Sequence, residues 1–165
     1  MIQKTILASL TVLLVFFAGC GKKVEPPQAP AAKTETQAAA ANEAGVKIVD
    51  EILAAFDHCV AEAAALAKDK PEASVLLPQL EKLYADYGGK MADLNAKFLA
   101  LRDQDIFAFR RANGYMSDNR PKHVFAKDNT LNSAYAYYNL EKGETAVVDM
   151  LSNKITRLLD DAVKQ

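Results

Sequence analysis

Apolar residues recur along most of this chain at alternating spacings of three and four residues. Such spacing places their side chains on one stripe of an α-helix and predicts helices that pack as in a heptad repeat. The first stripe comprises Val49, Ile52, Phe56, Cys59, Ala63 and Leu66. We expect its helix to begin at Asn42, which can serve as the N-cap, and to stop before Pro71.

A second stripe comprises Leu80, Tyr84, Tyr87, Met91, Leu94, Phe98 and Leu101. Its phase is unchanged across Gly88 and Gly89, although each glycine costs about 1 kcal/mol relative to alanine inside a helix. The unbroken phase favours one long helix, straight or bent, that ends near residue 113. The stripe shifts to another face after Asp105, and turn-forming residues predict a long loop over residues 113–127.

The third stripe begins after Asp128, a good N-cap, and its two halves are out of phase around Gly143. This mismatch predicts a kink or a short break at the glycine. The stripe comprises Leu131, Tyr135, Tyr138, Val148, Leu151, Ile155, Leu158 and Ala162. Together the stripes predict an all-α fold, an antiparallel bundle of three long amphipathic helices, or of four to five shorter ones if the glycines break them.

The composition changes before residue 42. Residues 21–41 contain three prolines and seven alanines, but Val24 is their only larger aliphatic residue. Such a segment cannot bury enough apolar surface to offset the entropy of ordering it. We therefore expect residues 20–41 to form a flexible linker and residues 42–165 to form the folded domain.

The first 19 residues have the pattern of a cleaved signal peptide. Lys4 precedes a mainly apolar stretch of twelve residues, 6–17, whereas a helix needs about 20 residues to cross a bilayer. The run ends in Phe17-Ala18-Gly19-Cys20, which resembles the lipobox of bacterial lipoproteins, except that Phe17 stands where that motif usually has Leu.

The lipobox resemblance implies cleavage after residue 19 and covalent lipidation of Cys20. Gly21 and Lys22 follow the cysteine in place of an aspartate, which implies an outer-membrane lipoprotein that faces the periplasm. The alternative is an ordinary secretory signal in which Cys20 is incidental.

Composition and motifs favour a protein without catalytic activity. After signal cleavage the formal charge is about −2, without the basic excess of nucleic-acid-binding proteins. His58, Cys59 and His123 lack the spacing of zinc ligands, and Cys59 lies on an apolar stripe. No phosphate-binding loop or nucleophile elbow occurs either. We therefore expect no enzyme, no metal and no cofactor beyond the lipid on Cys20.

Two groups of side chains are candidates for contact with a partner. The tyrosines Tyr135, Tyr137 and Tyr138 are our first choice for such a surface, although core packing is the interpretation that we prefer for them. The most basic local group comprises Arg102, Arg110, Arg111 and Arg120. A long second helix would place these arginines near its C-terminus, where the helix dipole favours cations, and an anionic partner is the alternative.

The sequence therefore predicts a membrane-anchored envelope lipoprotein with a non-enzymatic role, which binds or scaffolds an unidentified envelope protein or assists its assembly. Its architecture resembles that of small helical lipoproteins such as secretion pilotins. One alternative is a cell-wall spacer like the murein lipoprotein, but here Lys164 is followed by Gln165, so no terminal lysine is available for attachment. Another is a carrier that holds a small apolar ligand between its helices.

Overall fold

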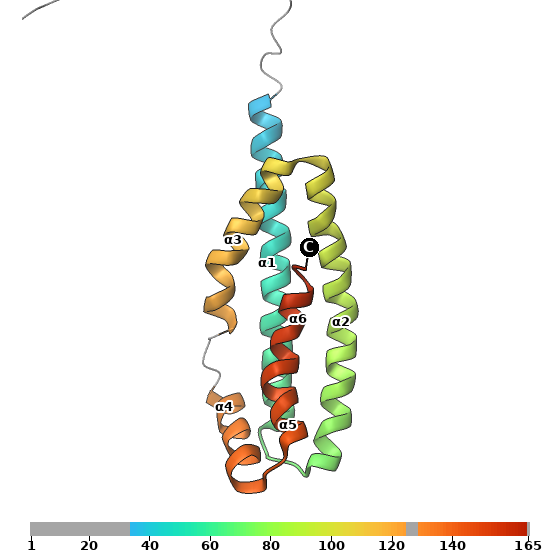
Figure 1. The fold of residues 1–165 in the computed structure, drawn as a ribbon, viewed down its shortest axis with the longest axis vertical. Coiled ribbons are helices and arrows are strands. Elements are labelled where there is room, and N and C mark those ends of the chain that lie inside the picture. Colours follow the sequence, from blue (N-terminus) through green and yellow to red (C-terminus); the bar gives the residue numbers. More distant parts are fainter. Residues whose placement is uncertain (1–33, 125–128, 165) are drawn as a thin grey trace, which may run out of the picture. The chain divides into compact units, whose positions relative to one another are not determined.

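The computed structural model describes residues 34–124 and 129–164, and these residues form helices without any strand, which confirms the all-α prediction (Figure 1). The elements are α1 (Thr34–Ala67), α2 (Ala73–Gln104), α3 (Ile106–Val124), α4 (Asn129–Ala136), the π-helical turn η1 (Tyr137–Lys142), α5 (Thr145–Asp149), the π-helical turn η2 (Met150–Lys154) and α6 (Ile155–Asp161). The predicted signal peptide, Cys20 and the linker up to residue 33 lie outside the described residues.

Helix α1 begins at Thr34, eight residues before the predicted N-cap Asn42. The predicted start is therefore wrong, and the last part of the predicted linker is helical. The physical reason is the run of four alanines at residues 38–41, because alanine has the highest helix propensity. Figure 1 shows these first turns of α1 extending past the corner at which α2 gives way to α3.

Helix α2 runs without interruption through Gly88 and Gly89, which confirms the prediction from the stripe's phase. It ends at Gln104, however, and not near residue 113. Asp105 has an extended backbone (φ −153°, ψ 98°), and the chain turns there into α3.

The predicted loop over residues 113–127 is wrong as far as Val124, where α3 ends, and residues 125–127 lie outside the described part of the chain. Asp105 caps the start of this helix. Its Oδ1 accepts hydrogen bonds from the backbone N–H groups of Phe107 (2.9 Å) and Ala108 (3.0 Å). These donors have no partner inside the helix, so the carboxylate acts as an N-cap for α3. Gly114, taken as a turn signal, lies inside this helix.

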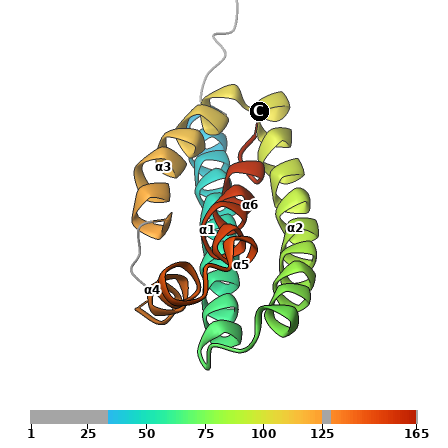
Figure 2. The ribbon, with the colours of Figure 1, turned by 60° about the horizontal axis from the view of Figure 1, so that its bottom comes forward.

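Helix α1 lies at the centre of the bundle. It packs against α2, α3, α4 and α6, with α2 and α3 on opposite sides (Figure 2). Its buried surface is therefore wider than the predicted stripe and also includes Leu53, Ala55 and Ala64. Gly45 allows α3 to approach closely, because a Cβ at this position would lie 3.1 Å from Cβ of Ala112.

The predicted break at Gly143 is confirmed. Gly143 has φ +66° and ψ 25°, a left-handed conformation that suits glycine, and it ends η1. The chain then reverses into α5, η2 and α6, which pack against α2. The hydroxyl of Tyr84 in α2 donates to the carbonyl of Met150, the first residue of η2, at 2.9 Å.

Candidate functional site

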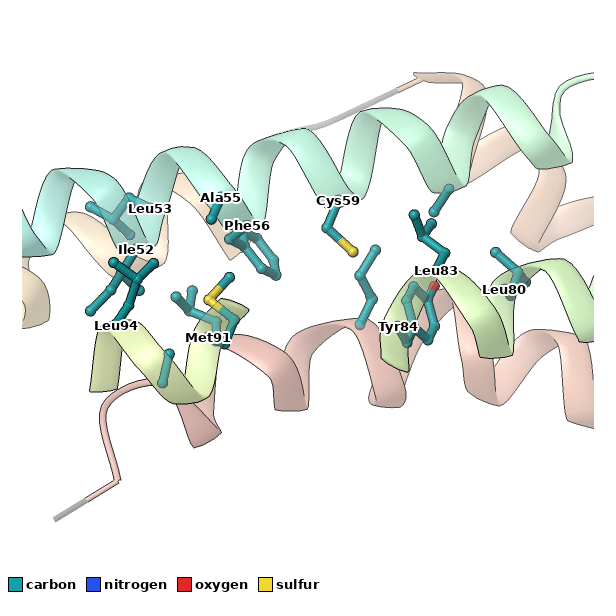
Figure 3. Close-up of a cluster of buried hydrophobic side chains, with 14 of the residues drawn as sticks. Ile52, Leu53, Ala55, Phe56, Cys59, Leu80, Leu83, Tyr84, Met91 and Leu94 are labelled. Carbon is teal, nitrogen blue, oxygen red and sulfur yellow. The ribbon is translucent and has the colours of Figure 1, made fainter. Parts of the chain in front are cut away.

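The residues considered as metal ligands do not meet. The Cys59 side chain is fully buried and points from α1 toward α2 (Figure 3). His58, the preceding residue, is exposed on another face of α1. His123 pairs through Nδ1 with the Asp57 carboxylate at 2.8 Å. Within the described ranges, no three His, Cys, Asp or Glu side chains gather as a metal site would require.

The environment of Cys59 makes its thiol unreactive. Burial raises the pKa of the Cys59 thiol to about 12, and the Glu62 carboxylate adds a smaller effect in the same direction. The nucleophilic thiolate is therefore suppressed at neutral pH. Figure 3 shows Cys59 among apolar side chains of α1 and α2, so it acts as a small core hydrophobe.

The three candidate tyrosines have different environments. Tyr138 is 1% exposed, and its hydroxyl donates to the carbonyl of Pro71 in the connection between α1 and α2. It is a core residue, so the predicted contact surface is wrong for this side chain. Tyr135 and Tyr137 are partly exposed, and their contact with a partner stays a prediction. Lys70 Nζ lies 4.5 Å from the centre of the Tyr137 ring, a cation–π contact.

An open groove of about 460 Å³ runs between α2 and the segment formed by η2 and α6. Its apolar lining comes from Tyr84, Met150 and Leu158. Its rim carries charges of both signs, from Glu81, Lys154, Arg157 and Asp161. The groove is open to solvent along its length, so it suits a partner's side chains better than an enclosed small ligand.

Two exposed large apolar side chains lie at the corner between α2 and α3. Phe107 is 75% exposed and Ile106 is 40% exposed. Their neighbour Phe109 is buried and stacks against Phe98 of α2, with ring centres 5.0 Å apart. The turn at Asp105 produces this division, because it sets which face of α3 meets the bundle.

Two of the four candidate arginines lie beside this corner. Arg110 and Arg111 are exposed and follow Phe107 by three and four residues, so all three share the outer face of α3. They lie near the N-terminus of α3, where the helix dipole disfavours cations. The dipole explanation is therefore wrong for Arg110 and Arg111.

The other two arginines have local explanations. Arg102 lies in the last turn of α2, as the dipole explanation requires, and is 3.6 Å from the Asp103 carboxylate. Arg120 forms an ion pair with Asp160, which links α3 to α6.

Sequence reasoning missed the exposed pair Ile106 and Phe107. It noticed that the stripe changes face after Asp105, but it kept both residues in a helix that continued to residue 113. The available signal was an aspartate followed directly by two apolar residues, since this pattern also fits an N-cap that starts a new helix.

No helix in the part of the chain that the structure describes is long and apolar enough to span a membrane. Comparisons with models of protein families, with curated proteins and with solved structures found no match.

Proposed function

We propose that this protein is a bacterial lipoprotein, anchored to an envelope membrane by lipid on Cys20, and that its helical bundle binds or scaffolds another envelope component without catalysis. The observation that carries the proposal is the motif Phe17-Ala18-Gly19-Cys20 at the end of a twelve-residue apolar run. A processed signal accounts for a run too short to span a bilayer.

The helical bundle supports a role for the lipid as an anchor only. Buried residues from α1, α2, α3 and the C-terminal helices form one continuous hydrophobic core. The members of this core that the structure describes lie between Val49 and Ala162, well after the lipidated end, which supports a body that folds while the lipid holds it at a membrane.

A binding role is supported by the accessible surfaces of the bundle. The open groove beside Tyr84, with a charged rim, and the partly exposed Tyr137 offer apolar contact area with polar edges. The carrier alternative is weaker, because the groove is open where a carrier needs an enclosed apolar cavity.

The anchor is tested by labelling cells with a fatty acid that carries a chemical handle. The wild-type protein should incorporate the label and begin at residue 20 by mass spectrometry, whereas Cys20→Ser should do neither and should leave the membrane fraction. Cys59→Ala is the matched control, because it removes the chain's other cysteine and should leave labelling unchanged. An unlabelled wild-type protein would refute the anchor.

The binding role is tested separately by photo-crosslinking in intact cells. A crosslinker in place of Tyr137 or at Lys154 on the groove rim should capture one partner in stoichiometric amount. A crosslinker at exposed Glu51 on α1 is the control. Absence of any discrete product from the first two positions would refute scaffolding through these surfaces.

A further inference from the structure

We infer that the corner between α2 and α3 is a second membrane contact, in which Phe107 and Ile106 enter an anionic phospholipid surface while Arg110 and Arg111 bind its phosphates. The inference rests on the proposed anchor, because the anchor brings this end of the bundle to a bilayer. It adds a surface of the folded body that touches the lipid directly.

The corner lies nearer to the start of α1 than to its end. Gly45 of α1 lies beside Ala108, Ala112 and Leu101, so the corner is about 16 Å along α1 from Thr34, at 1.5 Å per residue. The far end of α1 is about 50 Å from Thr34 on the same measure. The 13 residues between Cys20 and Thr34 span at most about 50 Å. Contact by the opposite end would require the linker at full extension, whereas contact by the corner requires only about a third of that reach. A lipid on Cys20 therefore favours contact by the corner.

The corner combines apolar and cationic side chains. Phe107 is 75% exposed, and the two arginines stand one turn further along the same face of α3. Apolar residues with cations beside them are the pattern by which helices bind at the interface of anionic membranes. Arginine stems can lie along apolar surface while the guanidinium groups reach phosphate oxygens.

The charges around the corner leave these arginines available. The Asp105 carboxylate is occupied as the cap of α3, and Asp103 lies beside Arg102. Arg111 borders a hollow that Glu43 and Asp50 also line, but neither Arg110 nor Arg111 forms an ion pair with another described residue.

The exposed apolar surface at the corner is small. Phe107 and Ile106 together expose roughly 200 Å² of side chain, since an aromatic side chain carries 150–250 Å² in all. A stable protein interface buries about 800 Å² on each partner. The apolar tip is therefore too small to hold a second copy of this chain, whereas a bilayer needs only a few inserted side chains to supplement a covalent anchor.

The test uses the mature chain, residues 20–165, with Cys20→Ser, so that no lipid contributes. Sedimentation with vesicles of phosphatidylcholine containing 30% phosphatidylglycerol should show binding, with little binding to phosphatidylcholine alone. Phe107→Ser and the double change Arg110→Gln with Arg111→Gln should each lower the partition constant at least five-fold. Leu140→Ser is the matched control, because Leu140 is 80% exposed but lies in η1, and it should change binding less than two-fold. Circular dichroism confirms that each variant folds.

A second readout uses the absence of tryptophan from the chain. Phe107→Trp should shift its fluorescence to the blue on addition of the anionic vesicles and should be quenched by brominated lipids, whereas Leu140→Trp should do neither. No binding, equal binding by Phe107→Ser, or equal quenching at both positions would overturn the inference. Because these chains carry no lipid, failure of Cys20 acylation in cells would refute the anchor alone and would leave the vesicle result unchanged.

Discussion

Replacing Gly89 by alanine should stabilise this protein, because Gly89 lies inside the uninterrupted helix α2. A Cβ added at this position meets no heavy atom within 4 Å, so the substitution introduces no clash. Alanine exceeds glycine in helix propensity by about 0.8–1.0 kcal/mol, and the free energy of unfolding should rise by nearly this amount. For a domain of this size the midpoint of thermal unfolding should rise by about 3–5 °C.

The assay is thermal and urea unfolding followed by circular dichroism at 222 nm. Two other glycines provide controls. Gly143→Ala should destabilise by about 1–2 kcal/mol, because its φ of +66° is left-handed and unfavourable for a residue with a Cβ. Gly45→Ala should stabilise the protein less than Gly89→Ala does, because the added Cβ would lie 3.1 Å from Cβ of Ala112.

The sign of the stability change in Gly89→Ala decides whether α2 is one continuous helix or two helices. A lower midpoint for Gly89→Ala, with an unchanged dependence on urea, would mean that the chain does not follow a regular helix there. The inference from the unbroken phase of the apolar stripe would then fail, and α2 would have to consist of two helices.

Three further predictions concern the core and the caps. Cys59→Ala should lower the free energy of unfolding by about 1 kcal/mol, the low end for deleting a buried group, as measured by chemical denaturation. Wild-type Cys59 should react with a thiol reagent only as the protein unfolds. Stability should fall as pH rises above about 9, because folding raises the pKa of this thiol to about 12 and only the unfolded chain loses the proton between these values. Cys59→Ala should make the profile shallower between about pH 9 and 10, below the range in which tyrosines with raised pKa values, such as Tyr84 and Tyr87, also contribute. An unchanged slope in that range would contradict the assignment. Tyr138→Phe should lower the free energy of unfolding by about 1 kcal/mol, because it removes the hydrogen bond to the Pro71 carbonyl, whereas Tyr135→Phe should lower it by less. Asp105→Ala should cost about 1 kcal/mol through loss of the α3 cap, and Asp105→Asn should restore most of it, as measured by urea unfolding.

The sequence by itself determined the features that depend on local periodicity. A 3.6-residue repeat predicts both the helix and its buried side, so the stripes of α1 and α2 identified Cys59, Met91 and Phe98 as core residues. The same reasoning predicted that α2 continues through Gly88, since tertiary packing outweighs the low helix propensity of one or two glycines. The motif at Cys20 is likewise local, and its interpretation remains a proposal.

Only the tertiary structure decided which neighbour covers each apolar side chain. Phe107 and Phe109 are both aromatic residues of α3, yet Phe107 is exposed and Phe109 is buried. The turn at Asp105 directs one face of α3 onto α1, which leaves the opposite face uncovered. Periodicity predicts that a helix has an apolar side, but that side is buried only where a second surface packs against it. The position of this second surface depends on residues far apart in the chain.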